Sequence, residues 1–460
     1  MDQEFVAEED REEDTYVLDK RDVLAIRNAV EVGDANLLSE LMEPLHPADI
    51  ADLLEQVSED ERRNLVLLYD REFDGEILSE LDESIREEVI AVLRPEVLVE
   101  AIRELESDDV VDLLEDLEGQ QHDAILDALE DSDRAAVEQS LVNPENSAGR
   151  LMQREVVSSP EHWSVGEAID FIRKSEGLPE QFYHIILVNP RFEPVGYVTL
   201  GRLMGSRREV SLADIAEESF RTFNASEDEA DVAYAFNQYH LISAPVVNDD
   251  GRLIGVITID DAMAVLDEEH EEDILRLAGV GESSLSDRVY DTTKRRLPWL
   301  AVNLVTAILA SLVIAQFEEI ITQFVALAVL MPIVASMGGN AGTQALTVAV
   351  RAIATRDLTG ANVWRVIRRE VLVGLANGMI FAVVMGIVGL IWFGSPLIGV
   401  IIATAMVINL VAAGLAGIGV PVLLERIGVD PALASGAFVT TVTDVVGFFA
   451  FLGLAALILL

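Results

Sequence analysis

The stretch ALASGAFVTTVTDVVGFFAFLGLAALILL, residues 432–460, is long and apolar enough to cross a membrane, and its single charge is Asp444. An aspartate at the centre of a membrane helix costs about 2.5–3.5 kcal/mol on insertion scales. That cost is bearable where the carboxylate faces a wet cavity or a cation, so Asp444 is a candidate for an ion pathway. The alternative is a protonated aspartate that bonds to a neighbouring helix.

Four more apolar stretches precede this one, which gives five predicted membrane spans. They cover residues 297–317, 320–350, 371–393 and 396–424. Lysine and arginine cluster before the first span and between the second and third, and Arg426 follows the fourth. Basic loops stay in the cytoplasm, so we expect a multi-pass protein of the cytoplasmic membrane with its N-terminus inside and its C-terminus outside. Five helices enclose little by themselves, which favours a pore between two copies of the chain.

Acidic residues are concentrated ahead of the membrane spans. The 460-residue chain holds 81 acidic and 32 basic residues, and residues 1–296 carry −48 of the net charge of −49. So acidic a surface argues against nucleic acid as a partner. The excess has two explanations, namely carboxylate ligands for a hard divalent cation and adaptation to high salt. Only three of the 32 bases are lysine, which favours a halophilic source for much of the excess.

The part of the chain ahead of the membrane spans divides into segments with different sequence patterns. Residues 1–20 are expected to form a disordered acidic arm, and residues 21–145 a solenoid of short amphipathic helices. Within residues 146–262, FYHIILVNPRFEPVGYVTLGRLM (182–204) and LISAPVVNDDGRLIGVITIDDAM (241–263) repeat one plan of two strands and a turn about sixty residues apart. Residues 263–292 continue as an acidic helix. The expected fold class is therefore multidomain α plus α/β, followed by an α-helical membrane domain of five spans from residue 293.

The second span contains MPIVASMGGNAGTQA, residues 331–345. Its proline and three glycines are expected to loosen the helix, and both close helix packing and pore lining explain them. In the last span, Thr440 and Asp444 lie four residues apart and share a helix face. Such oxygens suit a hard divalent cation, with Mg²⁺ weakly favoured. The chain has no cysteine, no nucleophile paired with a base and no phosphate loop, so we expect no enzyme.

The order of these parts, with four local motifs, resembles the MgtE family of magnesium channels. The motifs are PIVASMGGNAGTQA (332–345), RAIATRDL (351–358), GVDPAL (428–433) and TTVTD (440–444). The duplicated α/β units resemble a tandem of cystathionine-β-synthase (CBS) domains. The resemblance implies a homodimer in membrane lipid, a central pore between protomers, and Mg²⁺ as both transported ion and intracellular gating ligand.

The resemblance also assigns the pore residues. Asp444 matches the pore aspartate, Asn340 the pore asparagine, and Thr440 a position whose backbone carbonyl faces the ion. Asp430, in GVDPAL, matches the aspartate at the cytoplasmic mouth.

The acidic helix resembles the connecting helix that plugs the pore in this family. Its implied regulatory Mg²⁺ ligands are Asp261, Glu269, Glu272 and Asp273, with the backbone of Gly149. One commonly acidic position is Ala264 here. Acids at 108, 109 and 112 are further candidates to share an ion with the CBS pair. Without the resemblance, the acidic helix would be interpreted as a solvated face.

Two alternatives concern the ligand and the activity. Thr258 and Asp261 have the spacing that contacts a nucleotide ribose in some CBS domains, which makes an adenine nucleotide possible, although we favour the ion at Asp261. The transported ion could instead be another divalent cation such as Co²⁺ or Mn²⁺. A sensor that transports nothing is a further alternative, but Asp444 argues against it.

Overall fold

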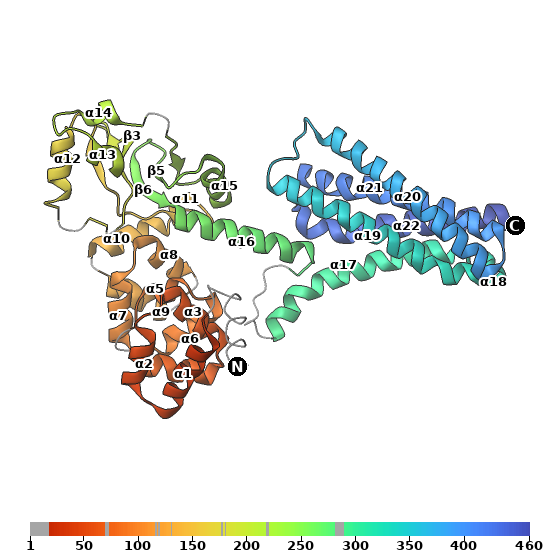
Figure 1. Ribbon diagram of the computed structural model, residues 1–460, viewed down its shortest axis with the longest axis horizontal. Helices are drawn as coiled ribbons and strands as arrows, with labels where there is room; N and C mark the ends of the chain where they lie inside the picture. The colour runs from red at the N-terminus through yellow and green to blue at the C-terminus, as the bar shows by residue number, and fades with distance from the viewer. Residues whose placement is uncertain are drawn as a thin grey trace, which may run out of the picture. The chain divides into compact units, whose positions relative to one another are not determined.

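The computed structural model of the chain forms two compact units, Met1–Glu268 and Glu269–Leu460, which are described separately below (Figure 1). The described residues are 18–69, 73–115, 117, 120–129, 131–175, 178–179, 181–217, 220–280 and 289–460. The predicted arm at residues 1–20 lies almost wholly outside them.

The first unit begins with the short helices of the predicted solenoid. They are α1 (Lys20–Val32), α2 (Ala35–Met42), α3 (Pro47–Gln56), α4 (Glu59–Tyr69), α5 (Glu76–Ser79), α6 (Glu83–Val92), α7 (Pro95–Glu104), α8 (Ser107–Glu115), α9 (Gln120–Ala128) and α10 (Asp131–Ser140). Side-chain caps such as Asp34, or prolines at the first helical position such as Pro95, mark their starts. The apolar stripes meet in one core around Leu53, Ile77 and Leu113, which are fully buried.

Two three-stranded sheets follow, with the same topology. The elements are α11 (Ala148–Leu151), β1 (Ser158–Pro160), α12 (Val165–Ile172), β2 (His184–Val188), β3 (Pro194–Thr199), α13 (Leu200–Gly205), α14 (Leu212–Ile215), β4 (Phe223–Asn224), α15 (Glu229–Tyr239), β5 (Ser243–Val247) and β6 (Leu253–Thr258). In each sheet the first strand runs parallel to the second, and the second pairs antiparallel with the third. The predicted duplication is therefore correct.

The two sheets meet at equivalent positions of the repeat. His184 opens β2 and Ser243 opens β5, 59 residues later, and their side chains are 2.5 Å apart at Nδ1 and Oγ. Burial lowers the pKa of His184, so the ring stays neutral and accepts from or donates to the serine hydroxyl. This hydrogen bond joins equivalent positions of the two CBS-like units and so connects the two sheets.

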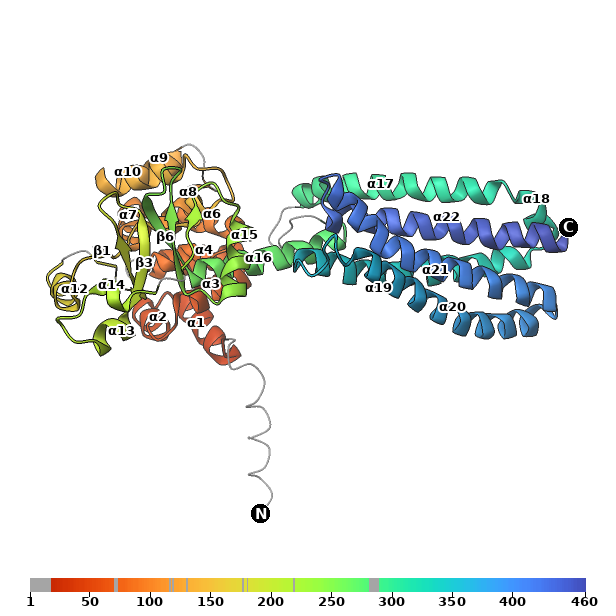
Figure 2. The same ribbon diagram turned by 90° about the horizontal axis from the view of Figure 1, so that it is seen from above.

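Among its described residues, the second unit contains five helices long and apolar enough to cross a membrane, and Figures 1 and 2 show them lying lengthwise beside one another. They follow α16 (Ile259–Leu277), in which the boundary between the two units falls. The helices are α17 (Val289–Ala315), the short α18 (Glu318–Gln323), α19 (Ala326–Ala354), α20 (Val363–Phe393), α21 (Pro396–Arg426) and α22 (Pro431–Leu459).

The second span corrects the sequence prediction in two ways. It begins at Ala326, because residues 318–323 form the separate helix α18, which ends where Phe324 leaves helical geometry. The expected loosening does not occur, since α19 runs unbroken through Pro332 to Ala354. Gly338 and Gly342 are buried against neighbouring helices, so close packing explains their lack of side chains.

Helices α20 and α21 form the tightest pair of the membrane unit. A two-residue turn joins them, with Gly394 in the left-handed conformation at φ +62°. Along their length, glycines of one helix touch the backbone of the other. A Cβ at Gly399 would lie 2.7 Å from the Gly386 oxygen, and one at Gly414 would lie 2.6 Å from the Glu370 oxygen. Such contacts hold only for glycine.

Candidate functional site: acidic residues in the membrane and in the soluble unit

Asp444 lies half-buried near the middle of α22. Within the described part of the chain its carboxylate makes no hydrogen bond or ion pair, so the alternative of a bond to a neighbouring helix gains no support. Thr440, one turn earlier, bonds through its hydroxyl to the Gly436 oxygen at 2.9 Å. The Thr440 carbonyl accepts from the Thr443 hydroxyl at 2.9 Å. The unbroken helix keeps Thr440 and Asp444 on one face, as predicted.

Asn340 lies on the exposed face of α19. Its nearest polar partner is Ser336, one turn earlier, at 3.5 Å. Gly338 and Gly342 are on the other side of the helix, where a Cβ at Gly342 would lie 2.7 Å from Val439 of α22. The glycine face of the motif is therefore used for packing inside the protomer, and the asparagine points outward from it.

Asp430 caps the start of α22 and also meets the end of α16. One carboxylate oxygen accepts from the Ala432 amide at 2.7 Å, and the other lies 3.6 Å from Nη1 of Arg276. The same guanidinium pairs with Glu272, one turn earlier on α16. Burial and the charge of Asp430 raise the pKa of Asp273. These predicted regulatory acids and the predicted mouth residue are thus together, around an arginine that the prediction had omitted.

In the soluble unit, acids of α8 gather with the start of α16. Asp108 is 8% exposed, and burial followed by the charge of Asp261 raises its pKa well above the usual range. Burial and the same neighbour raise the pKa of Asp109 to about 7. Burial raises the pKa of Asp261 to about 6, against hydrogen bonds from Thr258 that lower it. Negative charges in low dielectric repel, so this cluster favours a proton or a bound cation.

These acids border a cavity of about 310 Å³. Two of the bordering acids already have a base, since Asp112 pairs with Arg86 at 2.7 Å and Glu115 with Arg150 at 2.6 Å. The volume of the cavity exceeds the roughly 180 Å³ that six waters fill at about 30 Å³ each, which is the volume that a hydrated Mg²⁺ needs. No three acids or histidines among the described residues stand close enough to form a ready-made metal cage.

One acid near this cluster escaped the sequence analysis. The pKa of Glu106 is raised by burial and by the charges of Glu155 and Asp261, although its hydrogen bond from Gln153, at 2.6 Å, lowers it. Glu106 directly precedes Ser107, Asp108 and Asp109 in the sequence, and this position could have marked it as a member of the acidic cluster. Predicted Glu269 lies half-buried on α16, beyond the unit boundary from Asp261. The predicted set is therefore split between the two units.

Gly149 is packed as a close backbone contact. Its amide donates to the Ala225 oxygen at 2.9 Å, and its carbonyl accepts from Asn143 at 3.1 Å. A Cβ would lie 2.5 Å from the Asn143 side chain. The carbonyl predicted to face an ion is thus engaged with an amide, and it retains one lone pair for another donor or a water-bound cation.

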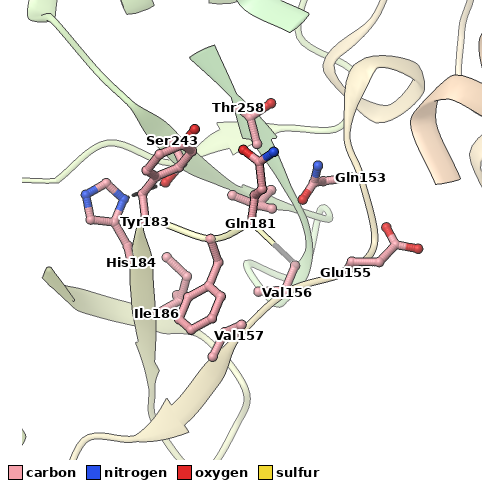
Figure 3. Close-up of a pocket in the computed structure, with 12 residues that line it drawn as sticks. Gln153, Glu155, Val156, Val157, Gln181, Tyr183, His184, Ile186, Ser243 and Thr258 are labelled. Atoms are coloured by element: carbon pink, nitrogen blue, oxygen red, sulfur yellow. Dashed lines mark hydrogen bonds between the residues drawn. The ribbon is translucent and has the colours of Figure 1, made fainter. Parts of the chain in front are cut away.

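The possible nucleotide position borders a small cavity between the two CBS-like halves, shown in Figure 3. Thr258, His184 and Ser243 line it, but its free volume is about 20 Å³, room for roughly one water. The hydroxyl of Thr258 donates to the Asp261 carboxylate at 2.5 Å, so the two groups predicted to contact a ribose bond to each other instead. An adenine base would have to displace these side chains.

Comparisons with known proteins agree with this architecture. A family model described as a divalent cation transporter matches residues 331–454, one for the MgtE intracellular N domain matches residues 45–146, and the CBS model matches residues 148–209 and 212–268. A curated relative, the magnesium transporter MgtE of Thermus thermophilus, is 31% identical over 96% of this chain and 99% of its own. The chain belongs to the MgtE family.

Other MgtE proteins are similar over shorter stretches. The magnesium transporter MgtE of Bacillus subtilis is 31% identical over 69% of this chain and 71% of its own length. A solved structure, the cytosolic domain of the Mg²⁺ channel MgtE in complex with ATP, is 28% identical, covers 53% of this chain and 99% of its own, and has a TM-score of 0.49. The predicted family and fold class are confirmed, and this MgtE-family protein is a multi-pass membrane protein.

Proposed function

We propose that this protein is a magnesium channel of the cytoplasmic membrane that works as a homodimer and closes when intracellular Mg²⁺ binds its soluble part. The observation that carries the proposal is Asp444, a carboxylate within a membrane span that has no partner among the described residues. Such a group is a functional site by default. The naming of the curated relatives as magnesium transporters supports Mg²⁺ as the ion.

The outward position of Asn340 supports a pore shared by two copies. An amide of this kind gains a role when a second protomer brings its own α19 and α22 to the same axis. Two carboxylates and two amides would then surround one ion, which keeps most of its water, as Mg²⁺ prefers. Asp430 would mark the cytoplasmic mouth, with the N-terminus inside and the C-terminus outside.

The cluster of Asp108, Asp109 and Asp261 supports gating by Mg²⁺. Burial, followed by the charges of neighbouring acids, raises the pKa values of these carboxyls. A divalent cation there would neutralise the buried charges and so stabilise the arrangement in which α8 and the start of α16 are close. Glu272 and Asp273 would act in the same way beside Asp430. Binding of an adenine nucleotide at Thr258 stays a prediction. We favour the ion there, because Asp261 would have to serve both ligands.

Mg²⁺ flux into proteoliposomes tests the proposal. The unsubstituted protein should conduct, and Asp444→Asn, which keeps shape and removes charge, should lose most of the flux while the protein stays folded and dimeric. The matched control is Glu319→Gln, which removes an exposed carboxylate of the membrane unit and should conduct normally. Normal flux through Asp444→Asn would refute the pore assignment. Competition by Co²⁺ and Mn²⁺ separates the magnesium channel from a channel for another divalent ion, and absence of any flux favours the sensor.

A further inference from the structure

Asn409 is a fully buried polar side chain in α21 that the pore assignment does not use. In the sequence it lies between Met406 and Leu410, which are buried in the apolar cluster of the membrane unit, and α19 and α22 both approach its amide. Its Nδ2 donates to the backbone oxygen of Val334 in α19 at 2.8 Å. Its Oδ1 is buried and has no hydrogen-bond partner.

Two glycines from different helices enclose this amide. A Cβ at Gly338 of α19 would lie 2.8 Å from Cγ of Asn409, and a Cβ at Gly447 of α22 would lie 2.7 Å from its Nδ2. Both distances are shorter than real contacts allow. The asparagine fits only because these two positions have no side chain, so the amide sets how closely α19 and α22 approach α21.

Stability does not explain an asparagine at this position. A buried amide oxygen without a partner loses its hydration, and interhelical hydrogen bonds return little stability in membranes. An apolar residue would avoid the loss. A hydrogen bond, however, has direction, and it fixes the rotation and height of α19 against α21 in a way that apolar packing does not.

The contact of Asn409 with Gly338 and Gly447 lies close in sequence to the residues of the proposed pore. Gly338 precedes Asn340 by two residues, and Gly447 follows Asp444 by three. We propose that Asn409 is a positioning residue, whose amide holds α19 and α22 in the register that spaces Asn340 and Asp444 for a hydrated Mg²⁺. The inference rests on the proposed channel function. Mg²⁺ demands near-ideal geometry whereas Ca²⁺ tolerates irregular coordination, so a looser register should harm Mg²⁺ recognition more.

The test is Mg²⁺ flux and Ca²⁺ competition in proteoliposomes, together with the thermal unfolding of the same full-length protein. Asn409→Val, which removes the hydrogen bond, should raise the half-saturating Mg²⁺ concentration about 3- to 10-fold, as expected for one lost interhelical bond, and should strengthen competition by Ca²⁺. Asn303→Leu, at an exposed asparagine of α17, is the control and should change neither value.

A compensated pair separates positioning from packing. In the double variant Asn409→Ala with Gly338→Ala, the new methyl group at position 338 fills space that the amide vacates. The unfolding temperature should therefore stay near that of the unsubstituted protein, while the half-saturating Mg²⁺ concentration should be raised as in Asn409→Val. A double variant with unaltered Mg²⁺ dependence would overturn the inference, because Asn409 would then serve packing alone. So would an Asn409→Val protein that unfolds earlier but keeps its Mg²⁺ dependence. Should Asn409→Val not fold, Gly447→Ala, which crowds the amide, must raise half-saturation or the inference fails. Absence of flux in the unsubstituted protein would instead refute the channel itself.

Discussion

Nη1 of Arg276 lies 3.6 Å from Oδ2 of Asp430, while the same guanidinium pairs with Glu272. The arginine joins the last turns of α16 to the first turn of α22. Leu277, the next residue, packs against the apolar cluster around Ala432 and Val439, so apolar packing supports this ion pair. A fixed cation therefore already occupies part of the acidic set that we propose binds Mg²⁺.

Replacing Arg276 should weaken closure. Arg276→Gln removes the guanidinium that lies beside Glu272 and Asp430, so the contact between the end of α16 and the start of α22 depends more on Mg²⁺. An ion pair of this exposure contributes about 0.2–1 kcal/mol, so the Mg²⁺ concentration that half-inhibits flux should rise up to about fivefold. Inhibition curves on proteoliposomes measure this, with Arg134→Gln as a control that removes a paired arginine of α10. An unchanged curve would remove Arg276 from gating.

The acid cluster of the soluble unit should make local stability fall as pH rises. The carboxyls of Asp109 and Asp261 have pKa values of about 7 and 6 in the folded protein, against 3.8 when unperturbed. The folded state therefore binds more protons between about pH 4 and 7, and stability declines across that window. Hydrogen exchange of α8 and the start of α16, followed from pH 5 to 8 without Mg²⁺, should show increasing exposure.

Mg²⁺ should abolish that decline, because the cation replaces the protons. Mg²⁺ should also bind more tightly at pH 7.5 than at pH 5.5 and release protons at the lower pH, which calorimetry in buffers of different ionisation enthalpy measures. Asp109→Asn should flatten the pH profile, whereas Asp170→Asn, at an exposed carboxylate paired with Arg208, should not. A flat profile in the unsubstituted protein would contradict the cluster's role.

Specific Mg²⁺ sites should resist monovalent salt better than a diffuse acidic surface, which is screened within about 3 Å at 1 M. Millimolar Mg²⁺ should protect α16 from proteolysis even in molar KCl. Replacing Glu269, Glu272 and Asp273 by alanine should remove this protection. The control replaces three exposed acids of the solenoid with alanine; they are Glu31, Glu40 and Glu43. Equal responses of the two triple variants would assign the α16 acids to salt adaptation.

The glycine contacts of α21 give a matched pair for stability. Gly399→Leu inserts a side chain where a Cβ already meets the Gly386 oxygen, so overpacking should cost at least about 1–3 kcal/mol and reduce the yield of folded protein. Gly419→Leu, on the same helix with open space around its Cβ position, should be tolerated. Yield and unfolding temperature after detergent extraction compare the two, and equal losses would show that the pairing of α20 with α21 does not depend on close backbone contact.

Periodicity and composition predicted the solenoid, the duplication and the five spans, because each depends on local patterns of apolar residues. The continuity of α19 could not be predicted, since it depends on neighbours that tolerate Pro332 and pack against Gly338. Asp444 was found as the single charge of the last span, and family resemblance added Asp430, whereas neither Arg276 nor Asn409 was singled out from the sequence. Their significance arises only when residues far apart in the chain, such as Val334 and Asn409, are brought into contact.

The pairing of α20 with α21 also bears on how the protein is made. The contacts between these two long helices, which a two-residue turn joins, link neighbouring parts of the chain, and such contacts form early. This hairpin should be complete in the membrane before the ribosome has released α22. The helix that carries Asp444 would then arrive after this hairpin, at a surface already assembled, so its costly carboxylate need not remain in lipid until α20 and α21 are synthesised.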